Sequence, residues 1–413
     1  MNYNPCITID VSQSKSHIQG FTHFNSTTRK PANITQAKSM RHTKHGYNKI
    51  LDLINFIYSK TGLVPLIVFE YTGVYHKTLE KFLLKHSIKY HIVAPLRAAK
   101  SRKNELRSVK TDKRDCLSLA KMFYNDDLGD FYHENEYYEE LKYLNRFYEN
   151  ILLRQQELKV NFRELLAVIY PNFKISKSNP DGAFRNVYTK EALGFLKEFP
   201  HQDLVVNSTT DEINCKLSKY ICKAHLKYLI SISEHLYNYC SNLISGCSST
   251  SNRISSLLFY IEQIEKYEDI LQDTLDKIHL LVKDSYMFNL LMSIPCVNKN
   301  LASRFICEIG DISRFKSYKA IIAFVGTDPQ IIQSGDNDGL HKHITKKGNK
   351  HLRTILYLIV QQMTKAKNIE SSIKSFYKKK TQQGLRKLVA LIACCNKLIR
   401  IIYYMSKTGA AFE

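Results

Sequence analysis

The sequence predicts an α/β domain followed by a mostly helical remainder, and three observations support this fold class. Residues 1–130 alternate short apolar runs with amphipathic segments, as expected for a sheet covered by helices. Residues 131–285 contain long stretches with the apolar spacing of helices, interrupted by a polar insert at residues 172–210. Residues 286–413 form a third, strongly basic region. A length of 413 residues is typical of about two to three domains.

The first domain is expected to contain a central sheet. Residues 6–11 favour a strand that carries Asp10 near its end, and residues 17–24 can form its hairpin partner. The almost entirely apolar run at residues 63–70 ends in Glu70 and predicts a central strand that is covered on both faces. One further strand is expected at residues 90–94, and helices are expected at residues 47–60, 77–86 and 112–124.

The middle region is expected to contain long helices. Residues 139–169 and 253–283 both show helical periodicity, and residues 212–244 resume this pattern after the insert. Pro171 ends the first of these helices, and the insert contains two further prolines. Two long helices on either side of an insert predict an antiparallel coiled coil or helical arm, and a plain helical bundle linker is the alternative.

The chain carries a large positive charge. It contains 60 lysine and arginine residues against 38 aspartate and glutamate residues, which gives a formal net charge of +22. This excess suggests a polyanionic partner, either nucleic acid or an anionic membrane surface. No apolar run approaches the roughly 18 uninterrupted residues of a membrane span, and the N-terminus lacks the pattern of a signal peptide. We therefore expect a cytoplasmic protein with no membrane partner.

Four acidic residues form the first candidate site. Asp10 and Glu70 are expected at strand ends, and Asp112 and Asp115 are three residues apart, so they share one face of a predicted helix. Strand ends of an α/β sheet meet at the crevice where ligands usually bind. Clustered carboxylates repel one another unless a cation lies between them, and their oxygen atoms select Mg²⁺ or Mn²⁺. The set predicts a metal site suited to phosphodiester chemistry, whereas each acid alone would more often cap a helix or face solvent.

A basic stretch surrounds the last two of these acids. A cluster of cations beside a metal site suits a nucleic-acid backbone that is held over the metal. We expect contacts with nucleic acid from Arg107, Lys110, Lys113 and Arg114. The whole stretch comprises Arg97, Lys100, Arg102, Lys103, Arg107, Lys110, Lys113 and Arg114.

The third region holds a second candidate site. Residues 292–315 have the pattern of a helix, a tight turn and a second helix, where backbone N–H groups can hold a phosphate. The glycine-rich segment at residues 324–353 is expected to be a loop, and it contains Ser334. Taken alone, a loop serine usually has a structural role, and a basic run is either a solvated face or a set of phosphate contacts. The basic residues near Ser334 are Lys342, Lys346, Lys347, Lys350 and Arg353.

These segments together resemble one family of transposases. The segments IDVS, FEYTGVYH and KTDKRDCLSLA, which contain the four acids, are similar to the DEDD motif of that family. The segments IPCV, IGDISRFKS, FVGTDP, QSG and ITKKGNKHLR are similar to its C-terminal motifs. The motifs follow the family's order and span most of the chain apart from the insert. The family is the insertion-sequence family numbered one hundred and ten, whose members are bridge-RNA-guided serine recombinases.

The resemblance implies a RuvC-like domain of the RNase H type, then a coiled coil, then a transposase domain with a nucleophilic serine. By motif position that serine is Ser334, and the metal-binding acids are Asp10, Glu70, Asp112 and Asp115. In the family, the serine and the acids come from different protomers and form a composite site. A structured guide RNA made by the element pairs with target and donor DNA. The implied partners are double-stranded DNA, this RNA and further copies of the chain.

The sequence departs from the family pattern at two places. The turn between the two helices usually has the sequence Ile-Pro-Gly-Val-Gly, but here Cys296 and Asn298 replace both glycines. Asparagine tolerates a positive φ whereas cysteine does so poorly, which argues against phosphate binding at this turn. The loop after Ser334 also contains two acids, Asp336 and Asp338, where basic residues would suit a nucleic-acid partner better.

We interpret the sequence as a DNA transposase or recombinase that acts by phosphoryl transfer. The four acids would hold Mg²⁺ (or Mn²⁺), and Ser334 would attack a DNA phosphate and form a transient phosphoserine link. One alternative is a metal-only nuclease or junction resolvase, in which water attacks. Another alternative is a non-enzymatic nucleic-acid-binding protein. The sequence leaves open whether a dimer or a tetramer acts.

Overall fold

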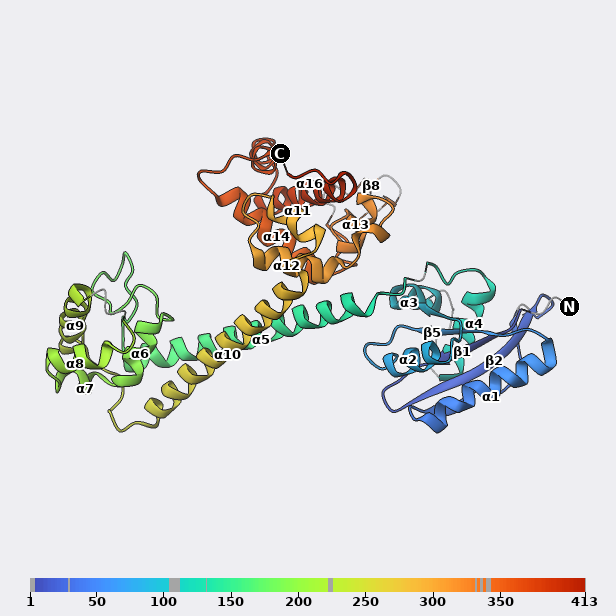
Figure 1. Ribbon diagram of the computed structural model, residues 1–413, viewed down its shortest axis with the longest axis horizontal. Helices are drawn as coiled ribbons and strands as arrows, with labels where there is room; N and C mark the ends of the chain where they lie inside the picture. Colours follow the sequence, from blue (N-terminus) through green and yellow to red (C-terminus); the bar gives the residue numbers. More distant parts are fainter. Residues whose placement is uncertain are drawn as a thin grey trace. The chain divides into compact units, whose positions relative to one another are not determined.

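The computed structural model describes residues 4–28, 30–103, 112–130, 132–221, 226–330, 333–334, 337–338 and 343–412. The chain divides into two compact units, Met1–His133 and Glu134–Glu413 (Figure 1). The first unit contains a sheet with helices, and the second is built almost entirely of helices. The predicted fold class, α/β followed by a mostly helical remainder, is confirmed.

The first unit is organised around a sheet with the strand order β3-β2-β1-β5-β6, in which β4 also pairs with β2. β1 and β2 form the predicted antiparallel hairpin, and β1, β5 and β6 run parallel to one another. Two strands, β3 and β4, were not predicted, because their residues are polar and β3 contains Pro31. Both pair only with β2, so they tolerate such residues as edge strands do. The strands are β1 (Cys6–Asp10), β2 (Lys15–Asn25), β3 (Lys30–Asn33), β4 (Lys38–Arg41), β5 (Leu66–Glu70) and β6 (Tyr90–Val93).

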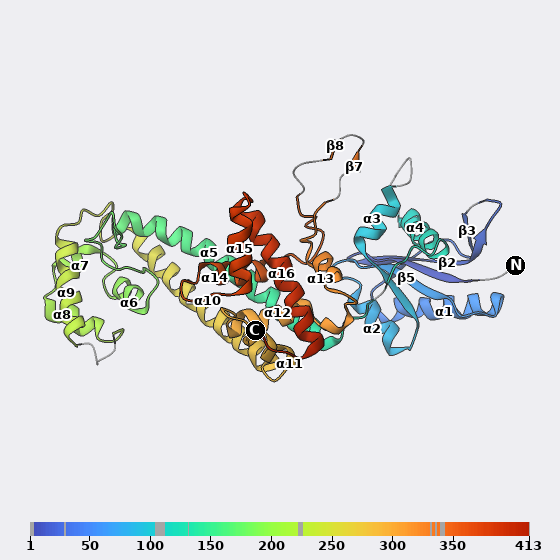
Figure 2. The ribbon, with the colours of Figure 1, turned by 90° about the horizontal axis from the view of Figure 1, so that it is seen from above.

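Helices cover both faces of this sheet (Figure 2). α1 and α2 pack on the face that carries Ile9 and Phe69. α3 and α4 pack on the opposite face, which carries Val68. β5 is therefore the doubly covered central strand that its apolar sequence predicted. The helix α3 was not predicted. The helices of this unit are α1 (Lys44–Thr61), α2 (Lys77–Lys85), α3 (Pro95–Lys103) and α4 (Asp112–Tyr124).

Two long helices form an arm in the second unit. α5 (Glu136–Ile169) and α10 (Asn252–Val282) lie side by side (Figure 1). Leu141 near the start of α5 shares a core with Ile278, whereas Phe162 near its end shares one with Leu257, so the helices run antiparallel. The segment between them, which includes the predicted insert at residues 172–210, folds against the second of these cores. Its helices are α6 (Lys190–Glu198), α7 (Gln202–Val206), α8 (Thr210–Leu217) and α9 (Leu226–Ser241).

The last part of the chain packs around the buried helices α14 and α16. Of the described helices, α16 alone has the length and mean hydropathy of a membrane span. Its side chains Cys394, Leu398 and Ile402 lie in the core of this unit, which accounts for its apolar sequence. The elements here are α11 (Tyr286–Met292), α12 (Lys299–Ile309), the 3₁₀ turn η2 (Ile312–Arg314), α13 (Tyr318–Val325), β7 (Gln333–Ser334), β8 (Asn337–Asp338), α14 (Lys350–Lys365), α15 (Ser372–Gln382) and α16 (Lys387–Thr408).

The predicted helix, turn and helix are present as α11, a turn and α12. Asn298, which replaces the second family glycine, caps α12, because its side chain accepts a hydrogen bond of 2.9 Å from the Leu301 N–H. Asparagine is among the best residues for this role. Cys296, which replaces the first glycine, has a φ of +65°. The left-handed conformation of the turn is therefore kept although a side chain strains it.

Replacing Cys296 with glycine should stabilise the protein, because glycine adopts a positive φ without strain. We expect a gain of about 1 kcal/mol in the free energy of unfolding, reduced by the lost contacts of the half-buried thiol. Thermal unfolding of Cys296→Gly and Cys296→Ala would measure it, since the alanine variant removes the thiol and keeps the strain. Equal melting temperatures for the two variants would contradict the strain at this turn.

Candidate active site and nucleic-acid interface

Two of the four predicted acids lie next to each other at the carboxyl ends of neighbouring strands. β1 and β5 are parallel, and their register pairs Ile9 with Phe69, so Asp10 and Glu70 follow side by side. Side chains alternate along a strand, and Ile9 and Phe69 both point toward α1 and α2. Asp10 and Glu70 therefore point to the opposite face, which α4 covers. This placement follows from the strand pairing.

The third acid comes from α4, which lies across this face. The Cys116 thiol donates to the backbone oxygen of His17 at 3.4 Å, which holds the start of α4 over the end of the β1–β2 hairpin. Burial raises the pKa of this thiol to about 12, and the negative charges of Asp10 and Asp115 contribute to the increase. Both carboxylates are thus close enough to Cys116 to act on it. Asp115 is itself 9% exposed.

The fourth acid, Asp112, is the first residue of α4, one turn before Asp115. Its side chain lies outside the described part of the chain. Among the side chains that the structure does describe, no three histidine, cysteine, aspartate or glutamate residues are arranged to hold a metal ion. The strands and α4 nevertheless bring Asp10, Glu70 and Asp115 to one edge of the sheet, and their oxygen atoms suit Mg²⁺ or Mn²⁺.

Ser334 lies in a short hairpin at the end of a hydrogen-bonded stem. β7 and β8 pair Ser334 with Asn337, and the Ser334 side chain lies outside the described residues. In the stem, the Gln330 N–H donates to the His343 oxygen at 2.8 Å, and the Thr345 N–H donates to the Asp328 oxygen at 2.9 Å. The base of the stem is tightly packed, because a Cβ atom added to Gly348 would lie 2.4 Å from the Phe324 oxygen. The stem thus fixes the root of the loop.

The predicted nucleic-acid contacts differ in their surroundings. Lys346, Lys347, Lys350 and Arg114 are exposed, as phosphate contacts require. Arg353 is only half-exposed, and its guanidinium donates to the Val325 oxygen at the end of α13 at 2.7 Å. Arg353 therefore has a structural role, whether or not it also binds phosphate. The remaining four lie outside the described residues or side chains: Arg107, Lys110, Lys113 and Lys342.

The variant Lys347→Ala should weaken the salt dependence of DNA binding. One phosphate contact contributes about 0.9 to the slope of log affinity against log salt concentration, so the slope should fall by about that amount. Because Lys347 is exposed, the melting temperature should stay the same. Arg353→Ala should instead lower the melting temperature, because it removes the bond to Val325. Binding titrations at several salt concentrations, with melting curves, would test both, and an unchanged slope for Lys347→Ala would count against a phosphate contact.

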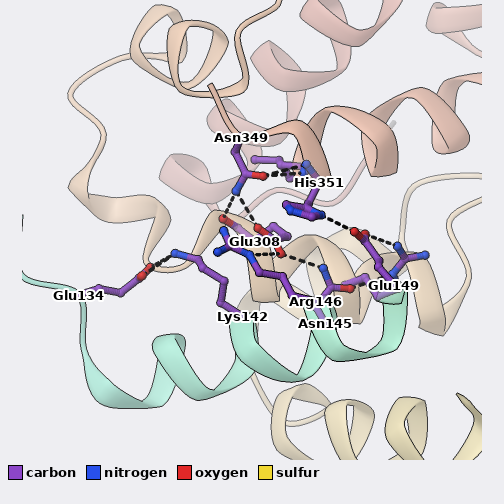
Figure 3. A network of polar contacts seen from close by, with 10 residues as sticks. Glu134, Lys142, Asn145, Arg146, Glu149, Glu308, Asn349 and His351 are labelled. Atoms are coloured by element: carbon purple, nitrogen blue, oxygen red, sulfur yellow. Dashed lines mark hydrogen bonds and ion pairs between the residues drawn. The ribbon is translucent and has the colours of Figure 1, made fainter. Parts of the chain in front are cut away.

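Sequence reasoning missed a buried ring of polar side chains in the second unit (Figure 3). At its centre is Glu308 on α12, which is wholly buried. One of its carboxylate oxygens accepts from the Asn145 amide at 2.9 Å, and the other accepts from the Asn349 amide at 2.7 Å. We call this set the Glu308 ring. Its members are Asn145 and Glu149 of α5, Arg304 and Glu308 of α12, and Asn349 and His351 at the start of α14.

The other side of the ring is closed by ion pairs. The Arg304 guanidinium donates to the Asn145 oxygen at 2.9 Å and to the Glu149 carboxylate at 2.6 Å, and Glu149 also pairs with His351. Burial alone would raise the pKa of Glu149, but hydrogen bonds and charge from His351 and Arg304 outweigh it, so this pKa is lowered. The one sequence signal for the ring was a charged glutamate inside the apolar segment FICEI.

Two family models match different parts of this chain. One, described as a transposase of the DEDD type, matches residues 7–171, and the other, described as Transposase IS116/IS110/IS902 family, matches residues 288–378. Together they cover more than half of the chain. The chain belongs to the IS110 family of transposases. The first matched range contains the four acids, the second contains Ser334, and the insert at residues 172–210 lies outside both.

Two relatives of this IS110-family chain are both named pilin gene-inverting protein. The protein from Moraxella lacunata is 28% identical over 129 residues, which is 31% of this chain and 39% of the relative. The protein from Moraxella bovis is 28% identical over 125 residues, 30% of this chain and 38% of the relative. The aligned stretch thus spans about two fifths of the length of each relative.

Proposed function

We propose that this chain is a DNA transposase or recombinase that cleaves and exchanges strands by phosphoryl transfer. The observation that carries the proposal is the placement of Asp10, Glu70 and Asp115 at one edge of the sheet, in a chain of the IS110 family. Two relatives named for gene inversion support the same class of reaction. The first unit would be a RuvC-like domain of the RNase H type.

Asp10, Glu70, Asp112 and Asp115 would hold Mg²⁺ (or Mn²⁺) at this edge. The bound cation would supply Lewis acidity to a phosphate oxygen and charge compensation for the developing negative charge. The two strand ends and the first turn of α4 would hold the carboxylates in place. Nearby cations, among them the exposed Arg114, would attract the DNA backbone to this face.

Ser334 would be the nucleophile. Its oxygen loses a proton and bonds to phosphorus while a DNA phosphorus–oxygen bond breaks, which leaves a DNA end with a free hydroxyl group. A DNA hydroxyl end then attacks the phosphoserine, so a phosphodiester bond forms and the bond between serine and phosphorus breaks. This step rejoins a strand without ATP. Activation of this hydroxyl would come from the acid site, including that of another protomer.

The partners would be double-stranded DNA, a structured guide RNA encoded by the element and further copies of this chain. The charge of +22 suits both nucleic acids. The chain would act in three parts: residues 1–130 with the acids, residues 131–285 as the arm, and residues 286–413 with the serine. The arm would join protomers into a dimer or tetramer, so that acids and serine of different copies meet.

The test is a strand-exchange reaction with purified protein, guide RNA, and donor and target DNA. Recombinant joints that depend on a divalent cation and on matched RNA are expected. Cleaved DNA without joints, and without attached protein, would favour the metal-only nuclease, which rests on the same acids and needs no serine. Binding without any cleavage would favour the non-enzymatic alternative.

A further inference from the structure

The Glu308 ring contains charged groups that are buried, so water cannot stabilise their charges. Glu308 and Asn145 are fully buried, and Arg304 is 7% exposed. Burying such groups is unfavourable unless every one finds a partner, so apolar side chains of similar size would stabilise the core at least as well. A polar ring in which every group has a partner allows only one register of its helices against one another. A shift of any of these helices would leave a buried charge unpaired. The ring therefore determines how α5, α12 and α14 fit together.

Asn349 connects this ring to the stem that carries the Ser334 loop. Its backbone N–H donates to the Phe324 oxygen at 2.7 Å, and its side-chain oxygen caps α14 by accepting from the His351 and Leu352 N–H groups at 3.0 Å. Its side-chain amide donates to Glu308. Three residues earlier, the Lys346 N–H donates to the Gly326 oxygen at 3.1 Å. One residue thus joins the stem, α14 and the buried ring.

We propose that Asn349 and Glu308 are positioning residues, which hold the root of the Ser334 loop in one register against the arm helix α5. The proposal rests on the proposed function, in which Ser334 must meet acids from elsewhere. Through Asn145, the arm and the loop share one buried carboxylate, so the arm sets the position of the loop. Neither residue touches DNA or the reacting atoms in this scheme.

The variant Asn349→Ser isolates the link. Serine still caps α14, but it is too short to reach Glu308. We expect the Thr345 and Lys346 amides to exchange with deuterium about tenfold faster. In the guided reaction, strand exchange at saturating DNA should slow about tenfold or more, while the dissociation constant for DNA stays the same. The matched control is Asn135→Ser, which makes the same change at the cap of α5, where Asn135 accepts from the Tyr137 N–H.

A charge swap provides the rescue. Asn349→Asp places two carboxylates against each other and should disturb the stem more than Asn349→Ser does. Adding Glu308→Gln restores a donor and an acceptor with their positions exchanged: the glutamine amide donates to Asp, and its oxygen accepts from Asn145. We expect the double variant to recover amide exchange rates and strand exchange to within about threefold of the original protein.

The two readouts separate this inference from the proposed function. Unchanged amide exchange in Asn349→Ser, or a folded double variant without recovery, would overturn the positioning role. If the swap restores amide exchange while the original protein joins no DNA, the positioning role stands and the proposed function fails. If Asn349→Asp does not fold, the comparison of Asn349→Ser with Asn135→Ser still tests the positioning role.

Discussion

The variant Asp10→Asn should abolish DNA strand cleavage and leave the fold intact. Asparagine keeps the size of aspartate but removes the negative charge, so the site loses one of the anionic oxygens that bind Mg²⁺. Metal catalysis supplies several kcal/mol of transition-state stabilisation, so its loss corresponds to a fall in cleavage rate of about a thousandfold or more. The measurement is single-turnover cleavage of labelled DNA with increasing Mg²⁺. Folding would be checked by the melting temperature. In the absence of metal this temperature should rise slightly, because the remaining acids repel one another less.

The matched control for this prediction is Asp52→Asn. Asp52 is exposed on α1, and α1 lies on the other face of the sheet from α4. The control should cleave DNA at the original rate. Normal cleavage in the presence of EDTA, or by Asp10→Asn at saturating Mg²⁺, would show that the acids at this sheet edge are not a catalytic metal site.

The variant Ser334→Ala should eliminate both strand exchange and any covalent DNA–protein species. The substitution removes a single oxygen atom, so folding and DNA binding should persist. A nicked or mismatched DNA substrate would trap the intermediate, which is then detected as a protease-sensitive adduct. Ser334→Cys should retain at most a trace of activity, because a thiolate is a strong nucleophile but suits magnesium-assisted phosphate chemistry badly.

The control for the serine prediction is Ser375→Ala, in the exposed part of α15. It should form the adduct and exchange strands as the original protein does. If cleavage products carry no protein, or if Ser334→Ala still forms the adduct, the serine assignment is wrong. The first of these results would leave the metal-only nuclease as the better explanation.

The elements that the sequence predicted well are those with strong apolar patterns. The apolar strands that end in Asp10 and Glu70 were both found, and their parallel pairing places the two acids together as strand-end reasoning expected. The edge strands β3 and β4 have no such pattern, because an edge strand is only partly covered. The helix α3 begins at Pro95 and has a basic sequence, so it was interpreted only as a nucleic-acid contact.

The Glu308 ring lay beyond sequence reasoning for a different reason. Its central bond joins residues 163 positions apart in the chain, and neither Asn145 nor Glu308 shows a local signal of its partner. Arg353 illustrates the same limit of local pattern. It belongs to a basic run, yet its guanidinium turns toward the Val325 oxygen, because the end of α13 leaves that carbonyl without a helical partner.

The helix α5 is continuous from Glu136 to Ile169, and this continuity makes it a lever. The Glu308 ring grips it at Asn145 and Glu149, and about 33 Å of helix extends from there to the insert. A tilt of about 5° at the ring would move the insert by about 3 Å, because displacement grows with distance from the pivot. A small force on the insert would likewise apply a large torque to the ring. A force on the insert would therefore rotate α5 about the Glu308 ring more effectively than the same force applied closer to the ring. Through the ring, this rotation would shift the root of the Ser334 loop.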